Sequence, residues 1–337
     1  MRDLISIESY IADQPDSALT AIRQVDTTTL RAKAVKAKYA LLHAMALDKN
    51  YIDTADARII MPAVDYFEKH GSPEEKLKAL MYLGVEQYNA GFYNQAIVSF
   101  YRASEYAPKV NDFNLLGILY SRMADTYTMT RDYSQAEEYI DKSIDSFRYC
   151  QKRKQEHLEL ARKAHNLAQQ KKWNEAEALY ESLLNDTLSN HATKAQLEID
   201  YAMCLLYSPS DKLPLAYHLM TDGISLGVKL NNEDQIGALA FLKDHYGEKT
   251  VSDSLLSLIH GHHKNHYWKH RIKLNYNDYK GAYDNLLLSS QSLDSLINII
   301  SVNSAANAQK LFLDLSSRVL VLIQFVHLNQ HAWPFVQ

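Results

Sequence analysis

The sequence predicts an all-α protein, an α–α superhelix (solenoid) built from stacked helix pairs. The first observation behind this prediction is a period of forty residues, which separates the alanines Ala96, Ala136, Ala176 and Ala216. The second is composition, because only 10 glycines and 7 prolines occur in 337 residues, which suits long helices joined by short turns. In such an array each unit buries its apolar face only by stacking on its neighbours.

Each of these alanines lies in a similar frame of residue sizes. A bulky residue stands three positions before it, at Tyr93, Tyr133, Trp173 and Leu213. Another stands four positions after it, at Phe100, Ile140, Tyr180 and Met220. A small residue stands twelve positions before it, at Gly84, Ala124, Ala164 and Cys204. We expect the small residues to mark close helix crossings and the bulky residues to fill the space beside them.

The segment from Leu80 to Pro108 carries this frame most completely. Its signature residues are Leu80, Leu83, Gly84, Tyr88, Gly91, Tyr93, Ala96, Phe100, Ala103 and Pro108. This pattern resembles the tetratricopeptide repeat at nearly every signature position. The resemblance implies two antiparallel helices in each unit. Residues 89–91 would form the turn, with Gly91 in the left-handed conformation that ends many helices.

The next two units keep the frame, and the fourth is looser. The second has Tyr120, Ala124, Tyr127, Tyr133, Ala136 and Ile140, and the third has Ala164, Leu167, Trp173, Ala176 and Tyr180. Pro209, Pro214 and Gly223 weaken the fourth. The pairs Ser134–Glu137 and Asn174–Glu177 predict capping boxes at the start of two second helices. The unit of the family is shorter than forty residues, so we expect longer helices here.

Weaker signals extend the array in both directions. Upstream, a helix near 37–47 is expected to pair with one that contains Ala63, and residues 15–25 read as a further helix. Downstream, helices are expected over 234–246, 252–260 and 264–274, followed by a unit around Ala282. The array is therefore assigned to residues 1–310, most strongly over 78–185. Residues 311–337, where only Asp314 and Arg318 are charged, are either a capping segment or a tail.

Charge and composition exclude several function classes. The formal net charge is −4, and the lysines and arginines are scattered, so nucleic acid is not expected as a partner. The two cysteines form neither a disulfide framework nor a zinc motif. No signal peptide and no apolar run of about 18 residues is found, so we expect a soluble protein without a membrane span, cytoplasmic by absence of a signal. No cofactor is expected.

Two motifs offer an enzymatic or metal-binding alternative. Residues 223–227, with Ser225 at the centre, match the nucleophile elbow of serine hydrolases, but a helical pattern rather than a strand precedes them. Histidines cluster at His260, His262, His263, His266 and His270. Three of them fall on one helix face, where imidazoles bind zinc, nickel or copper, but no acidic or cysteine ligand stands beside them. The expected interpretations are a solvent-side serine and a polar helix with two histidines packed against neighbours.

Partner binding is expected on the first helices, because the resemblance places them along the concave face of the array. The transferred positions are Lys78, Met81, Tyr88, Asn89, Asp125, Met129, His165 and Gln169. Family members that bind chaperones grip a carboxylate with Lys, Arg and Asn, whereas this chain has Met81, Val85, Ser121 and Asp125 instead. A mildly apolar groove suits an amphipathic helix or an extended peptide better. The alternative is that Val85, Ile118, Leu158 and Ala161 are core residues.

The sequence thus predicts a non-enzymatic scaffold for a protein or peptide partner. More narrowly, Asp16–Leu19 and residues 291–296 resemble the tetratricopeptide sensory region of bacterial membrane-anchored regulators. That resemblance implies a signalling role and a location outside the cytoplasm, in the periplasm. The alternative is an intracellular peptide-binding regulator, which also uses units of about forty residues.

Overall fold

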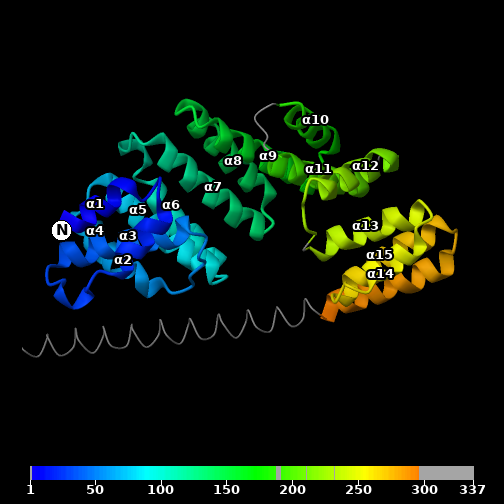
Figure 1. The fold of residues 1–337 in the computed structure, drawn as a ribbon, viewed down its shortest axis with the longest axis horizontal. Helices are drawn as coiled ribbons and strands as arrows, with labels where there is room; N and C mark the ends of the chain where they lie inside the picture. The colour runs from blue at the N-terminus through cyan, green and yellow to red at the C-terminus, as the bar shows by residue number, and fades with distance from the viewer. Residues whose placement is uncertain (1, 187–190, 210, 231, 296–337) are drawn as a thin grey trace, which may run out of the picture. The chain divides into compact units, whose positions relative to one another are not determined.

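The computed structural model describes residues 2–186, 191–209, 211–230 and 232–295 (Figure 1). Every regular element in these ranges is a helix, so the prediction of an all-α fold is confirmed. The chain divides into two compact units, Met1–Val228 and Lys229–Gln337. No helix among the described residues has the length and apolar character needed to cross a membrane.

Unit 1 consists of consecutive helices and three short 3₁₀ turns. The α-helices are α1 Arg2–Tyr10, α2 Pro15–Arg23, α3 Lys33–Lys49, α4 Met61–His70, α5 Pro73–Asn89, α6 Tyr93–Ser104, α7 Phe113–Met129, α8 Tyr133–Tyr149, α9 Arg153–Gln169, α10 Trp173–Leu184, α11 His191–Tyr207 and α12 Leu213–Ser225. The 3₁₀ turns are η1 Thr27–Thr29, η2 Ala57–Ile59 and η3 Ala107–Lys109. Unit 2 contains α13 Glu233–His245, α14 Lys249–Leu256, α15 His262–Asn275 and a helix over 279–295.

The forty-residue period governs the helix boundaries of unit 1. The first helices α3, α5, α7 and α9 are each 17 residues long and begin one period apart, at 33, 73, 113 and 153. The second helices α6, α8, α10 and α12 begin at the bulky frame residues Tyr93, Tyr133, Trp173 and Leu213. The period therefore reaches one unit further upstream than the alanine frame indicates.

The turn after each of these first helices contains one residue with a left-handed backbone. These residues are Tyr51, Gly91, Arg131 and Lys171, with φ between 55° and 77°. In the second of these turns the Phe92 N–H donates to the Gln87 carbonyl at 2.8 Å, and the other three make the same bond. Such bonds satisfy carbonyls at the helix end. The prediction for Gly91 is confirmed, and the other three positions show that this backbone does not require glycine here.

The small frame residues lie at helix crossings, as predicted. Ala63, Ala96, Ala136, Ala176 and Ala216 are all 0% exposed. At Gly84 an added Cβ would lie 2.6 Å from Phe100 Cε1, because the Phe100 ring of α6 covers the glycine of α5. A side chain on Gly84 would therefore force the two helices apart.

The two predicted capping boxes are wrong. Helix α8 begins at Tyr133, and Asp132 before it caps the helix by accepting from the Gln135 N–H at 3.1 Å. Helix α10 begins at Trp173, and no side chain caps its first turn. Because both helices start before Ser134 and Asn174, these residues already lie inside the first turn. A capping box does occur at α5, between Ser72 and Glu75.

The helices of unit 1 pack mainly on their neighbours in sequence, which stacks them as antiparallel pairs (Figure 1). First helices also contact the first helices of adjacent units, at α3–α5, α5–α7 and α9–α11. We call the side on which α3, α5, α7, α9 and α11 succeed one another the first-helix face. It brings residues from well-separated parts of the chain together.

Unit 2 has the helices that the sequence predicts. Trp268 of α15 is fully buried, and its indole ring covers Gly237 of α13. Ala282 is buried in the helix over 279–295, as its frame predicts. The proposed division into an array over 1–310 and a segment over 311–337 stays a prediction, since 311–337 lies outside the described residues.

Candidate functional site

The residues transferred to the concave face lie on α5, α7 and α9 but differ in accessibility. Tyr88 is half-buried, and its ring centre lies 5.4 Å from that of Tyr93. Met129 is 49% exposed, whereas Met81 is 1% exposed. Met81 is therefore a core residue, because it points between packed helices, and its assignment to the groove is corrected. Val85 is also buried in the core.

The remaining transferred residues have partners nearby. Lys78 pairs with Glu74 on its own helix. The Asn89 side-chain amide donates to the Thr54 carbonyl at 3.1 Å. His165 and Gln169 are exposed on α9, with 3.3 Å between His165 Nε2 and Gln169 Nε2. Asp125 differs from all of these because it belongs to a larger set of charged residues.

Arg162 organises the first part of that set. Its Nη1 donates to the Ser121 hydroxyl at 2.6 Å and lies 3.0 Å from Asp125 Oδ1 and 3.4 Å from Glu159 Oε1. The Ser121 hydroxyl in turn donates to Glu159 at 2.8 Å. These contacts join α7 to α9 through charged and hydroxyl side chains.

Arg122 organises the second part. Its Nη2 donates to Asp48 Oδ1 at 2.7 Å, which links α7 to α3 across 74 residues of sequence. Arg122 and Arg162 lie one period apart, at equivalent positions of α7 and α9. We call Asp48, Ser121, Arg122, Asp125, Glu159 and Arg162 the ionic cluster. Asp125 could be identified as a candidate from the repeat phase, whereas neither arginine was identified, although their forty-residue spacing is a usable signal.

Accessibility within the ionic cluster rises from the carboxylates to the guanidinium groups. The exposed fractions of the side chains are 5% for Glu159, 18% for Asp48, 27% for Asp125, 36% for Arg122 and 42% for Arg162. Each contact of Arg162 uses Nη1, so its Nε and Nη2 make no hydrogen bond within the described residues. The carboxylates hold the arginines in place, and the arginines keep donors at the surface.

The electrostatics of the cluster reflect its partial burial. Desolvation raises the pKa of Asp125 and of Glu159, and it outweighs the attraction of Arg162. Burial alone would lower the pKa of Arg162, but Asp125 and Glu159 raise it. Tyr88 also has a raised pKa, first through desolvation and then through the negative charge of Asp125. Tyr88 of α5 therefore shares one electrostatic environment with α7 and α9.

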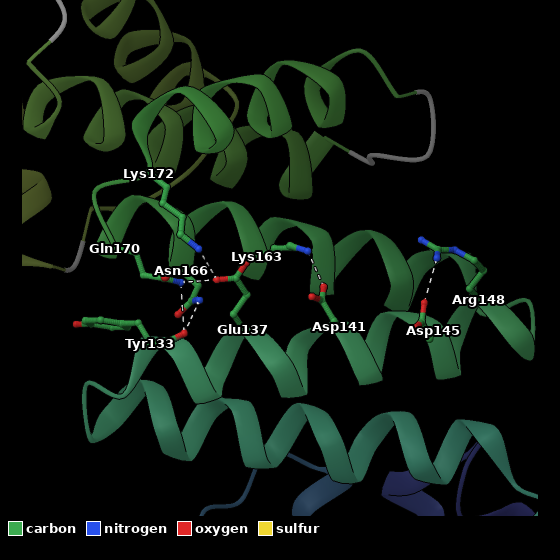
Figure 2. A network of polar contacts seen from close by, with 9 residues as sticks. All are labelled: Tyr133, Glu137, Asp141, Asp145, Arg148, Lys163, Asn166, Gln170 and Lys172. Atoms are coloured by element: carbon green, nitrogen blue, oxygen red, sulfur yellow. Dashed lines mark hydrogen bonds and ion pairs between the residues drawn. The ribbon is translucent and has the colours of Figure 1, made fainter.

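The seam between α8 and α9 is also polar but has a different character (Figure 2). Glu137 accepts hydrogen bonds from Gln170 at 2.7 Å and Lys172 at 2.9 Å. The Asn166 amide donates to the Tyr133 carbonyl at 2.9 Å, and Lys163 pairs with Asp141 at 2.6 Å. In Figure 2 these side chains point across the seam toward one another. We interpret the seam as a packing interface.

The two alternative chemical motifs do not form sites. Ser225 is the last residue of α12, is exposed, and donates its hydroxyl to the Asp222 carbonyl at 2.8 Å. No strand precedes it in the described part of the chain, so the geometry of a nucleophile elbow is missing there. His266 Nδ1 lies 3.1 Å from Asn285 Oδ1, and His270 Nδ1 donates to the Ala282 carbonyl at 2.8 Å. Both histidines pack against the next helix, as expected, and no cluster of metal-ligating side chains is found among the described residues.

No protein-family model and no curated protein matches the chain. Solved structures do match. The apo form of the quorum sensor NprR from B. thuringiensis aligns with a TM-score of 0.63 and 16% identity, over 90% of this chain and 95% of that chain. A Rap protein complexed with Competence and Sporulation Factor aligns with a TM-score of 0.62 and 15% identity, over 96% of this chain and 92% of that chain.

NprR in complex with its cognate peptide NprX gives a TM-score of 0.57 and 14% identity, over 89% of this chain and 97% of that chain. At these identities the likeness shows the fold alone. The predicted solenoid of tetratricopeptide-like helix pairs is thereby confirmed. The narrower resemblance to membrane-anchored regulators stays a prediction.

Proposed function

We propose that this chain is a non-enzymatic scaffold that binds a peptide, or an extended segment of a partner protein, along its first-helix face, and that it serves a regulatory role. The observation that carries the proposal is the ionic cluster. It places two arginines one repeat apart, with unused N–H donors at the surface and carboxylates behind them.

Partial burial of the ionic cluster has a free-energy cost. Charged groups between packed helices lose hydration, and apolar side chains of similar size stabilise such a contact as well or better. A charged face is favoured where a ligand uses it, because charges fix the register and orientation of a bound chain. Arg122 and Arg162 would donate to ligand carbonyl or carboxylate oxygens, and Asp125 would accept from ligand N–H groups.

Two kinds of neighbouring side chain would complete the site. Tyr88 offers an aromatic surface with a hydroxyl at its edge. Met129, His165 and Gln169 are accessible on the same helices and would contact the flanking parts of a ligand. Lys78 and Asn89 stay in the proposed site at its α5 side, whereas Met81 is left out because it is buried.

The solved structures support the class of ligand. The NprR structure with NprX contains a cognate peptide, and the Rap structure contains Competence and Sporulation Factor. Both proteins have the arrangement of helices found here. We infer that a peptide-binding regulator is the better of the two regulator classes that the sequence suggests.

The test begins with a selection of peptides by the purified full chain from a phage-displayed random library. Selected peptides are then synthesised, and their affinity is measured by calorimetry for the wild type and three variants. We expect Tyr88→Ala and Asp125→Ala to weaken binding about tenfold or more, since loss of a well-buried contact costs on the order of 1–3 kcal/mol.

Tyr149→Ala is the matched control, because Tyr149 is 71% exposed on the second helix α8 and lies outside the proposed site. It should bind the selected peptides as the wild type does. Circular dichroism and thermal unfolding check that each variant is folded. Equal affinity of all three variants, or the absence of any enriched peptide, would contradict the proposed function.

A further inference from the structure

A cleft separate from the ionic cluster lies between helices α6 and α8 and against α7. It has a volume of about 420 Å³, and η3 closes one end. This volume is at the small end of the range for ligand sites, roughly 300–1,000 Å³. Such a cleft accepts a few residues of extended chain rather than a whole helix, whose diameter with side chains is about 10–12 Å.

Tyrosines from three helices form the walls. The Tyr139 ring of α8 stacks on Tyr127 of α7 with 5.5 Å between ring centres and 5° between ring planes. It lies 6.2 Å from the Tyr120 ring, also of α7. Tyr101 of α6 completes the lining and is 56% exposed. We call the space lined by Tyr101, Tyr120 and Tyr139 the tyrosine cleft.

The three tyrosine hydroxyls of the cleft have no acceptor among the described residues, whereas Ser104 and Lys142 in its lining donate to Tyr101 and Glu138. Within the described residues, the hydroxyls of Tyr101, Tyr120 and Tyr139 make no hydrogen bond to protein atoms. The Tyr120 and Tyr139 rings pack against neighbouring rings, whereas Tyr101 is exposed at the edge of the cleft. A ligand with apolar rings and free carbonyl groups would match both properties of the cleft.

The charges at the rim differ between its two sides. Lys142 places its ammonium 4.6 Å from the centre of the Tyr139 ring and pairs with Glu138 at 2.6 Å. Glu105, at the C-terminal end of α6, is exposed and forms no ion pair within the described part of the chain. A basic group of a ligand could therefore pair with Glu105. It would not find a partner on the α8 side, where Lys142 already supplies a positive charge.

We propose that the tyrosine cleft binds a proline-rich segment of a partner protein in the polyproline II conformation, with a basic residue of that segment on Glu105. Proline rings present apolar C–H groups to aromatic faces and carry no N–H to desolvate. Polyproline II chains have no internal hydrogen bonds, so their carbonyls remain free to accept from tyrosine hydroxyls. The chain is also preformed, so binding costs little ordering entropy.

This surface is separate from the proposed peptide site. The tyrosine cleft uses α6, η3 and the second-helix side of α7 and α8, whereas the ionic cluster uses the first-helix face. A failure of one proposal therefore leaves the other standing.

The experiment uses fluorescence anisotropy with the full chain and three labelled synthetic peptides. The first probe is a run of nine prolines interrupted by one arginine. The second replaces the prolines by alternating glycine and serine, and the third replaces the arginine by glutamate. We expect saturable binding of the first probe, with at least tenfold weaker binding of the other two.

Single-residue variants then test whether the first probe binds in the tyrosine cleft. Tyr101→Ala and Tyr120→Ala should each lower the affinity for the first probe at least tenfold. Tyr101→Phe should lower this affinity less, because only the hydroxyl is removed. Glu105→Gln should weaken the arginine probe several-fold. Tyr149→Ala, at the exposed end of α8 and outside the cleft, should leave binding unchanged. The change at exposed Tyr101 is expected to leave the fold intact, which thermal unfolding checks.

Three results would overturn the proposal. One is the absence of saturable binding to the wild type. Another is equal binding of the proline and glycine–serine probes, which would mean that the cleft does not select proline. The third is a pattern of variant effects. If Tyr101→Ala and Tyr120→Ala leave the affinity for the proline–arginine probe unchanged but Tyr88→Ala lowers it, the probe binds on the first-helix face.

Discussion

Lys172 Nζ lies 2.9 Å from Glu137 Oε2 (Figure 2). An equivalent ion pair joins Lys212 and Glu177 one period later. Each lysine stands just before a second helix, and each glutamate lies in the second helix of the preceding unit. The pair therefore ties adjacent repeats together at one defined register.

Replacement of Glu137 by glutamine should lower stability at neutral pH. Burial opposes ionisation of Glu137, but hydrogen bonds from Gln170 and Lys172 outweigh it and lower its pKa. A carboxyl with a lowered folded pKa stabilises the fold above its ordinary value of about 4.3, and this contribution is lost as the pH falls through the folded pKa. Denaturation midpoints at pH 7 and near pH 3 should differ between variant and wild type only at the higher pH.

Glu138→Gln is the control for this prediction, because Glu138 is the adjacent residue and its side chain is 51% exposed. We expect a smaller effect there, since exposed ion pairs contribute little. Equal effects of the two substitutions at pH 7 would refute the importance of the Glu137–Lys172 pair.

Ala96→Leu should destabilise unit 1 by about 1–3 kcal/mol, because added methylene groups at a close helix crossing force strain. Ala96 is 0% exposed. Chemical denaturation measures the change in unfolding free energy. Asn94→Leu, on the exposed side of the same helix, is the control and should have little effect. A larger effect at Asn94 would contradict the assignment of Ala96 to the crossing.

Glu159→Gln should change the pH dependence of stability in the ionic cluster. Desolvation raises the pKa of Glu159, so its charge disfavours the folded state at and above neutral pH. The penalty disappears as the pH falls through the raised pKa toward the ordinary carboxyl range, because the wild type then becomes protonated.

The variant should therefore gain stability relative to the wild type at neutral pH, and the gain should shrink on acidification. Thermal unfolding across this pH range measures it. Glu156→Gln, on the same helix and paired with Arg148, controls for the loss of one negative charge. A variant that is less stable than the wild type at neutral pH and equal to it in acid would reverse the prediction.

His270→Ala should destabilise unit 2 by roughly 0.5–1.5 kcal/mol, the typical net contribution of one hydrogen bond. Its Nδ1 donates to the Ala282 carbonyl and so connects α15 to the helix over 279–295. His262 is exposed, and His262→Ala should have no measurable effect. Added Zn²⁺ should not raise the unfolding temperature of the wild type, and a rise that both substitutions abolish would indicate a metal site instead.

The helix over 279–295 carries an apolar stripe whose members are 43% to 68% exposed: Tyr279, Tyr283, Leu286, Leu287 and Leu293. The terminal units of a repeat array need a cover for such a face, and residues 311–337, outside the described residues, remain predicted to be either a capping segment or a tail. If they cover it, Tyr283→Ser with Leu287→Ser should destabilise unit 2 by on the order of 1 kcal/mol or more. Asp284→Ser is the control, and equal stability of both variants would reject the cap.

The sequence alone determined the helix pairs and their period. Ala96 and its equivalents could be predicted as crossing residues because size at a repeated position is a local property, and the period shows that it recurs. The same reasoning placed Tyr88 and Asp125 on first helices. It failed for the capping boxes, since Ser134 and Glu137 have the right spacing but the helix begins before them. A short polar motif does not specify which of several nearby residues caps a helix.

The tertiary structure decided which residues come together. The sequence does not indicate that Asp48 meets Arg122 across 74 residues, or that Tyr101, Tyr120 and Tyr139 line one cleft. It also could not show that Met81 is buried while Met129 is exposed, because both lie on first helices among the positions transferred to the concave face. A repeated pattern fixes the path of each unit, but the contacts between units depend on the angle and offset at which helices stack. Small differences in these quantities decide whether a side chain is enclosed by its neighbours or left at the surface.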